Sequence, residues 1–522
     1  MIDYNLNNLS LEEKIGQLII FGFDALEIND HALKLIRDFK AGNVILFSRN
    51  VKDPKQLFEL NKSLQKLALT HLKVPLFISI DQEGGMVTRI TNKATYFPGA
   101  MTLAATDKPE NAYISGKIMG QELKALGVNM NLAPSLDINN NPKNPVIGVR
   151  SFGDTPKRVS EFGIENIRGL QENVVATAKH FPGHGDTFVD SHLGLPQINK
   201  TLQDLEEFEL IPFKKAIDNG VKAIMSAHIN FPAITEENLP ATLSYACLTE
   251  LLRKKLGFIG LIITDCMQMK AIQKDYTTKK GVLMAIEAGA NLVCISHSEV
   301  LQTEAIEYVK QAVIEGRLPI EVIDDRVKRV LEFKKNNIEV NLNKSYEEVL
   351  EIVINEKSKA ISYQLTKDAF TLYKGGNIDY SKKSLVIASE PISTTIADES
   401  DGVISIIKAI EQENINYDTY KIAVDVKYSE VEELKRIVKD YQQVIFCSYN
   451  SNIYESQLHL IEELNKIENF FVIAMRNPYD SLFIKDLKNL MLLYEYTPNS
   501  VRVLIEYLKG NLAPRGKAPV KL

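Results

Sequence analysis

The chain has 522 residues, which is long for one ordinary domain and enough for a large α/β barrel followed by a second unit. Its composition, 45% hydrophobic and 25% charged residues, is typical of a folded globular protein and excludes a disordered, collagen-like or coiled-coil chain. The net charge of −6, without any dense basic run, argues against nucleic-acid binding.

Neither membrane insertion nor export is predicted. No apolar run approaches the roughly 18 residues of a membrane-spanning helix. The first residues, MIDYNLNNLS, lack the basic start of a signal peptide. The four cysteines (Cys247, Cys266, Cys294 and Cys447) have no CxxC spacing, which favours reduced core thiols over a disulfide or zinc framework. We therefore expect a soluble, cytoplasmic protein of two domains.

The first two thirds of the chain alternate short apolar runs with amphipathic stretches. The opening helix is marked by a capping box in SLEE, formed by Ser10 and Glu13. Eight strands are predicted at residues 18–23, 43–48, 75–81, 128–137, 174–181, 221–229, 261–267 and 290–296. Nearly continuous apolar strands are typical of parallel sheets buried on both faces, so this pattern predicts an α/β fold that begins with a (β/α)₈ TIM-type barrel. A doubly wound open sheet is the alternative, although neither a P-loop nor a GxGxxG motif begins any of the helices.

The last third has a different composition. Only five of the 27 glycines follow residue 344, so this part needs fewer tight turns. Residues 343–370 are predicted to be helical, and five strands are predicted at residues 384–389, 420–426, 443–449, 470–476 and 490–496. We expect a barrel at 1–342, a helical linker at 343–375 and a smaller three-layer α/β sandwich domain at 376–522.

Charged and imidazole side chains lie at the ends of several predicted barrel strands, where barrel enzymes carry their chemistry. In chain order these residues are Asp81, with Arg89 beyond it; Asp137, with Arg150 in the following loop; Lys179 and His180; His228; and Asp265. Taken singly, Asp81 could cap a turn, the two arginines could be surface cations, and His228 could be a hydrogen-bonded strand-end histidine. Together on one face they predict a functional site, because apolar residues already fill the core of the barrel.

The loop HFPGHGDTFVDSH supports two hypotheses. One is a divalent metal site, with ligands drawn from His180, His184, Asp186, Asp190 and His192. The spacing, however, matches neither HExxH nor a paired HxH. The favoured hypothesis is a dyad, because residues i and i+2 of an extended loop point the same way and Asp190 can then raise the pKa of His192. Such a histidine can donate and accept a proton near neutral pH.

Four stretches, IDQEGGMVTR, VIGVRSFG, AKHFPGHGDTFVDSHLGLP and IITDCMQMKAI, occur in this order and resemble glycoside hydrolase family 3, specifically its β-N-acetylglucosaminidase branch. The barrel motifs span about residues 10–335, and the closing GNLAPRGKAPVKL is similar to the end of that family's second α/β domain. The resemblance therefore covers most of the chain. It implies neither a metal nor an organic cofactor.

The resemblance also implies roles for individual residues. Asp265 matches the family's catalytic nucleophile, and His192 matches the general acid/base of this branch, with Asp190 as its partner. The residues that match those holding the hydroxyl and N-acetyl groups of the sugar in the −1 subsite are Asp81, Arg89, Arg150, Lys179 and His180. Asp137 and His228 are neighbours without an assigned role. A carboxylate at a strand end can attack the anomeric carbon to give a covalent glycosyl-enzyme, and the reaction then retains configuration.

The expected protein is thus a retaining exo-β-N-acetylglucosaminidase that acts inside the cell on muropeptides from peptidoglycan turnover or on chitooligosaccharides. A neutral imidazole repels an incoming anion less than a carboxylate does, so phosphate is a candidate acceptor beside water. The alternatives are a β-N-acetylglucosaminide phosphorylase or a β-glucosidase on the same scaffold, a metal-dependent hydrolase, and a non-enzymatic sugar-binding protein. Because His192 lies in a loop of the barrel itself, the second domain is expected to be structural or to shape the aglycone side.

Overall fold

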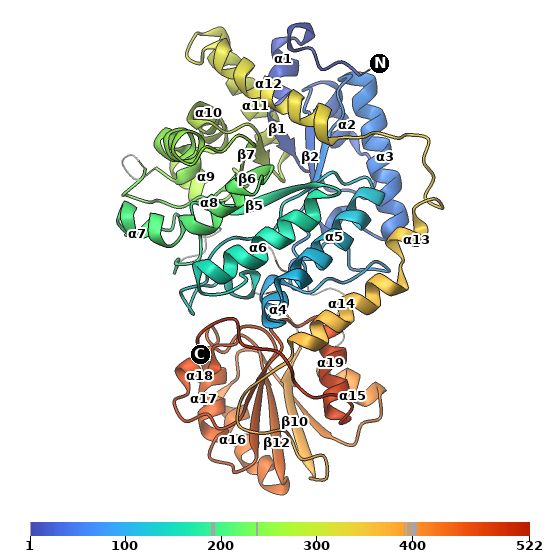
Figure 1. Cartoon of the computed structure of the whole chain (residues 1–522), viewed down its shortest axis with the longest axis vertical. Helices are drawn as coiled ribbons and strands as arrows, with labels where there is room; N and C mark the ends of the chain where they lie inside the picture. The colour runs from blue at the N-terminus through green and yellow to red at the C-terminus, as the bar shows by residue number, and fades with distance from the viewer. Residues whose placement is uncertain (1, 189–193, 236–238, 391, 394–397, 399–404) are drawn as a thin grey trace.

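Eight parallel strands form a nearly closed barrel in the first two thirds of the chain (Figure 1). The computed structural model describes residues 2–188, 194–235, 239–390, 392–393, 398 and 405–522. The strands are β1 (Ile19–Phe21), β2 (Asn43–Leu46), β3 (Phe77–Ile80), β4 (Met130–Asn131), β5 (Val175–Phe181), β6 (Ala223–Ser226), β7 (Leu261–Thr264) and β8 (Val293–Ile295). β8 pairs with β1, and a bridge between Ile263 and Leu292 links β7 to β8. The barrel prediction is confirmed, each strand lying within its predicted segment, and the open-sheet alternative is wrong.

All residues of these eight strands are buried, which explains why the sequence shows no alternation of apolar and polar residues there. Helices surround the barrel. They are α1 (Leu11–Gln17), α2 (Asp30–Arg37), α3 (Pro54–His71), α4 (Ala100–Ala105), α5 (Pro109–Ala125), α6 (Pro156–Gln171), α7 (Leu202–Glu207), α8 (Leu210–Asp218), a π-helix (Ala246–Lys255), α9 (Lys270–Tyr276), α10 (Thr278–Ala288), α11 (Glu299–Ile314) and α12 (Ile320–Asn337). The predicted capping box begins α1, since the Ser10 hydroxyl accepts the Glu13 N–H and the Glu13 carboxylate accepts the Ser10 N–H.

The second sheet has six strands in the order β11-β10-β12-β13-β14-β9. They are β9 (Thr371–Lys374), β10 (Ser384–Ser389), β11 (Asp418–Ile422), β12 (Gln443–Ser448), β13 (Phe470–Ala474) and β14 (Leu490–Leu492). All pairs are parallel except β14 with β9. The helices are α15 (Ile406–Gln412), α16 (Tyr428–Ile437), α17 (Glu455–Leu464), α18 (Asp480–Phe483) and α19 (Pro498–Leu508). Because α15 contacts α19 and α16 contacts α17 on the opposite face, the domain is the predicted three-layer α/β sandwich.

The sequence predicts one helix at 343–370 between the two sheets, and this prediction is wrong. The structure has a short helix, α13 (Leu350–Val353), and a separate helix, α14 (Glu356–Ala369), whose first turn is capped by the Asn355 side chain. Asn355 favours a cap over a helix interior because its side chain competes for backbone N–H groups. β9 was not predicted, since it is an edge strand in which only Thr371 is buried.

The second domain lies against the loops that follow β3 and β4, at the carboxyl end of the barrel (Figure 1). Glu495 accepts hydrogen bonds from the Gly99 N–H and the Thr102 hydroxyl, each 2.8 Å long. Asn139 donates to the hydroxyl of Tyr479. Met86 and Val149 of these loops, together with Met101 of α4, belong to the hydrophobic core of the second domain. No helix in the described parts of the chain combines the length and apolar character needed to cross a bilayer.

Candidate active site

A cavity of about 530 Å³ lies at the carboxyl ends of the barrel strands. It is lined by all six predicted site residues that the structure describes, namely Asp81, Arg89, Arg150, Lys179, His180 and Asp265. The two other predicted residues, Asp190 and His192, lie outside the described residues. These side chains are up to 184 positions apart in the sequence, and they surround one cavity because each lies at or just beyond the end of a barrel strand.

Two buried cations and two carboxylates form a continuous network on one side of this cavity. Lys179 Nζ lies 2.7 Å from Asp81 Oδ1 and 2.7 Å from Glu83 Oε1. The Arg150 guanidinium binds the same Glu83 with two hydrogen bonds, Nη2 to Oε1 at 2.7 Å and Nε to Oε2 at 2.9 Å. Glu83 thus links Arg150 to Lys179. Sequence reasoning missed it, although its place two residues beyond Asp81 was a usable signal, because alternate residues of an extended segment share a side.

The charges of this network are set by the partners that each group has inside the protein. Burial by itself would raise the pKa of the Glu83 carboxyl, but Arg150 and Lys179 outweigh burial and hold that pKa well below its usual value. Burial would lower the pKa of Lys179, and the carboxylates of Asp81 and Glu83 raise it instead. Arg150, Lys179 and Glu83 are therefore charged at neutral pH.

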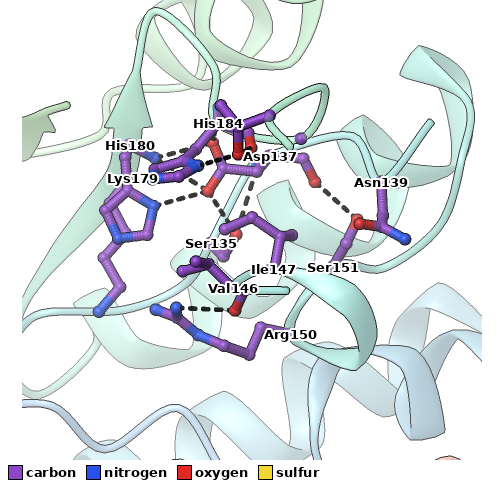
Figure 2. Close-up of polar contacts among 12 residues, drawn as sticks. Ser135, Asp137, Asn139, Val146, Ile147, Arg150, Ser151, Lys179, His180 and His184 are labelled. Atoms are coloured by element: carbon purple, nitrogen blue, oxygen red, sulfur yellow. Dashed lines mark hydrogen bonds and ion pairs between the residues drawn. The ribbon is translucent and has the colours of Figure 1, made fainter. Parts of the chain in front are cut away.

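Asp137 organises the adjoining cluster around His180 (Figure 2). Its Oδ2 lies 2.6 Å from Nδ1 of His180 and accepts a hydrogen bond from the Ser135 hydroxyl at 2.9 Å. Its Oδ1 accepts the backbone N–H groups of His180 at 3.1 Å and His184 at 2.6 Å. Burial would raise the pKa of Asp137, but the two histidines and these hydrogen bonds lower it to about 2. An ionised Asp137 accepts the Nδ1 proton of His180, which leaves Nε2 for contacts in the cavity.

The remaining histidines of these loops differ in their surroundings. His184 lines the cavity, and burial together with the nearby His180 lowers its pKa to about 4, so its ring is neutral at physiological pH. His228 instead is a hydrogen-bonded strand-end residue, with Nδ1 2.9 Å from the Thr242 hydroxyl and Nε2 3.0 Å from the Cys266 carbonyl. Among the described residues, no group of three or more His, Cys, Asp or Glu side chains is placed to hold a metal ion.

Asp265 is the first residue beyond β7, so its position is fixed by the parallel sheet. Its Oδ1 accepts the backbone N–H of Cys266 at 2.7 Å, and the residue is partly exposed toward the cavity. Cys266 and Cys294 also line the cavity, and burial raises the pKa of both thiols. The thiols are therefore protonated at neutral pH.

An eight-stranded parallel barrel with charged side chains around a strand-end cavity defines a barrel enzyme. The chain belongs to glycosyl hydrolase family 3, since residues 10–333 match the Glycosyl hydrolase family 3 N terminal domain. It is accordingly a glycoside hydrolase, and the family resemblance found in the sequence is confirmed.

Similar proteins agree with this assignment. The chain is 38% identical over 276 residues to Beta-hexosaminidase A of Pseudoalteromonas piscicida, a match that covers 50% of this chain and 46%, about half, of that protein. It is 37% identical over 262 residues to a Beta-hexosaminidase of Nitrosomonas eutropha, covering 49% of this chain and 73% of that one. The structure matches a glycoside hydrolase family 3 beta-N-acetylglucosaminidase from Paenibacillus sp. str. FPU-7 with a TM-score of 0.91 and 39% identity, over 98% of this chain and 99% of that chain.

Proposed function

We propose that this chain is a retaining exo-β-N-acetylglucosaminidase that hydrolyses terminal β-linked N-acetylglucosamine. The observation that carries the proposal is the cavity at the strand ends, which is lined by Asp265 and by the network of Asp81, Lys179 and Arg150. Beta-hexosaminidase activity is supported by the names of the relatives, and the N-acetylglucosamine preference by the Paenibacillus enzyme, which is similar over nearly its whole length.

In the proposed mechanism, Asp265 attacks the anomeric carbon while the glycosidic oxygen leaves. His192, oriented by Asp190, donates its proton to that oxygen, and then removes a proton from the water that hydrolyses the glycosyl-Asp265 ester. Both steps pass through an oxocarbenium-like transition state, and two inversions give net retention. The proton transfers of such a histidine contribute about 10² to 10⁴ in rate.

The terminal sugar is proposed to lie against the buried network. Lys179 and Arg150 donate to hydroxyl oxygens, Asp81 accepts from hydroxyl groups, and His180 presents Nε2 because Asp137 holds its Nδ1. Arg89, whose backbone N–H is held by the Gln82 side chain at 2.8 Å, is the remaining candidate for the N-acetyl group. Charged donors held in place by other buried groups lose little entropy when they bind a ligand.

Several finer points stay predictions. Muropeptides or chitooligosaccharides are the proposed substrates, with action inside the cell, and phosphate competes with water as the acceptor in the phosphorylase alternative. In the β-glucosidase alternative, the same residues would bind a sugar that has a hydroxyl group where N-acetylglucosamine has its N-acetyl group. We also propose the division into a catalytic barrel at 1–342, a linker at 343–375 and a second domain at 376–522.

The anomer that is released first tests the covalent mechanism. Proton NMR of N-acetylglucosamine released from a β-linked disaccharide is expected to show the β-anomer first, with the α-anomer appearing later by mutarotation. With phosphate present, a β-linked sugar phosphate would identify phosphate as the acceptor. An α-anomer as the first product would contradict the glycosyl-Asp265 intermediate, because one displacement by water inverts the configuration.

A further inference from the structure

The buried ion pair of the candidate active site joins two separate segments of the barrel, and the second domain contacts both of them. Glu83 lies in the loop after β3, and Arg150 lies in the segment between β4 and α6. Their two hydrogen bonds place both charged groups beside Lys179, and all three residues line the cavity. Because the two partners belong to different segments, the geometry of the pair depends on what holds each segment in place.

Glu495 of the second domain supports the loop after β3. Its Oε2 accepts hydrogen bonds from the Gly99 N–H and the Thr102 hydroxyl, each at 2.8 Å. The same oxygen would lie only 3.2 Å from a Cβ atom at Gly85, which is two residues beyond Glu83. The Glu495 carboxylate therefore packs against the backbone of the loop that carries Glu83.

Tyr479 supports the segment that carries Arg150, through the side chain of Asn139. The Asn139 Nδ2 donates to the Tyr479 hydroxyl, and its Oδ1 accepts the Gly148 N–H at 3.1 Å. Gly148 is two residues before Arg150 and has a φ of +46°, and a Cβ atom there would lie 2.6 Å from Oδ1 of Asn477. Such a close approach at a positive φ requires glycine. The second domain thus supports the backbone two residues away from each partner of the ion pair.

The two supporting residues are buried at the boundary between the domains. Tyr479 follows β13 and Glu495 follows β14, so both lie beyond the carboxyl ends of neighbouring parallel strands, on the side of the sheet that meets the barrel (Figure 1). They are 2% and 1% exposed, and neither is among the described residues that line the cavity. Any influence of these side chains on a bound sugar must therefore pass through the barrel segments that they hold.

We propose that Glu495 and Tyr479 are positioning residues, which fix the Glu83–Arg150 pair by holding the two segments that carry it. The inference rests on the proposed β-N-acetylglucosaminidase function, in which Lys179 and Arg150 bind the terminal sugar. When either segment is released, the two partners shift relative to each other and both cations lose their fixed orientation. Small displacements of groups that orient the substrate are enough to slow an enzyme.

Removing one support is expected to slow the reaction of the terminal sugar. Tyr479→Phe removes the hydroxyl that accepts from Asn139. Glu495→Met keeps an unbranched side chain but leaves the Gly99 N–H and the Thr102 hydroxyl without their acceptor. We expect each variant to lower kcat/KM for the nitrophenyl β-N-acetylglucosaminide by about three- to tenfold, the effect of one or two hydrogen bonds. Glu495→Gln keeps an oxygen for these donors and is expected to restore most of the activity.

Two further measurements separate positioning from a general loss of stability. β-N-acetylglucosaminyl fluoride has no aglycone sugar and should show the same losses, because the ion pair is proposed to lie at the terminal sugar. In the double variant, the combined loss in kcat/KM is expected to be smaller than the product of the two single losses, since both substitutions loosen one ion pair.

The matched control is Tyr507→Phe, a buried tyrosine of the second domain whose hydroxyl accepts the Ile378 N–H of the same domain at 3.1 Å. It loses a buried hydrogen bond as Tyr479→Phe does, but it is expected to keep wild-type kcat/KM. Thermal unfolding of every variant checks that the assays are made on folded protein, and Tyr479→Phe carries the test by itself if Glu495→Met fails to fold.

Four outcomes would overturn the inference and leave the proposed function standing. They are wild-type kcat/KM in Tyr479→Phe, losses with only one of the two substrates, single losses that multiply in the double variant, and an equal loss in Tyr507→Phe. A folded wild type that turned over neither substrate would overturn the proposed function, and the inference with it.

Discussion

Asp265→Asn is expected to lower kcat for a β-N-acetylglucosaminide by about 10⁴-fold or more, the scale seen when a nucleophile is removed from a covalent mechanism. The amide cannot form the glycosyl ester on which the proposed mechanism depends. Its oxygen can still accept the Cys266 N–H that the carboxylate accepts now, so the strand end should keep its geometry. Steady-state kinetics with matched circular dichroism spectra measure the effect.

Two controls separate loss of the nucleophile from a general disturbance. Asp275→Asn makes the same chemical change at an exposed position of α9 that does not line the cavity, and it is expected to keep wild-type turnover. In Asp265→Ala, added azide should attack the anomeric carbon from the vacated side and give an α-glycosyl azide. Undiminished turnover by Asp265→Asn would remove Asp265 from the mechanism.

Glu83→Ala is expected to lower the free energy of unfolding by about 3 to 5 kcal/mol, since it leaves two buried cations side by side without the carboxylate between them. Lys179 and Arg150 should also lose their fixed positions, so we expect kcat/KM to fall as well. Chemical denaturation measures the first effect. The control is Glu463→Gln, because Glu463 also bridges two lysines, Lys435 and Lys466, but does so at the protein surface, where such pairs contribute little.

The Glu83 carboxylate also makes the free energy of unfolding depend on pH, and the direction of its pKa shift fixes the sign of that dependence. The pKa of Glu83 is lower in the folded protein than its unfolded value of about 4.5, so its contribution to stability is complete above that pH. The contribution is lost as the pH falls below 4.5 toward the folded pKa, because protons then bind the unfolded state first. Glu83→Gln should therefore flatten the decline in unfolding free energy between about pH 5 and pH 3. Parallel declines in wild type and variant would contradict this assignment.

The architecture was predictable where the local sequence carries the signal. Eight strands buried on both faces are unbroken apolar runs. A parallel barrel places their polar ends together, which is why the sequence could place Asp81, Lys179 and Asp265 around one cavity. The edge strand β9 was missed because only one residue of its sequence TLYK is buried. The prediction of a single helix at 343–370 was wrong because Asn355 caps the start of a new helix. Local periodicity cannot distinguish such breaks from a continuous helix.

The missed functional contacts are those made between distant segments. Glu83 and Arg150, which both line the cavity, are 67 residues apart in the sequence. Asp137 had no role in the prediction because its function is to hold the ring of His180 and two backbone N–H groups, which only the folded loops bring to it. A single sequence shows residue types at strand ends, whereas the pairing of buried charges depends on which loops fold against each other.

Release of nitrophenol from its β-N-acetylglucosaminide and its β-glucoside, with and without phosphate, is the most direct test of the proposed activity. The wild-type chain is expected to prefer the acetamido sugar, and His192→Ala to slow its turnover by about 10² to 10⁴. Faster turnover of the glucoside would shift the assignment to a β-glucosidase. Release from neither substrate by a folded wild-type chain would contradict the proposed β-N-acetylglucosaminidase activity.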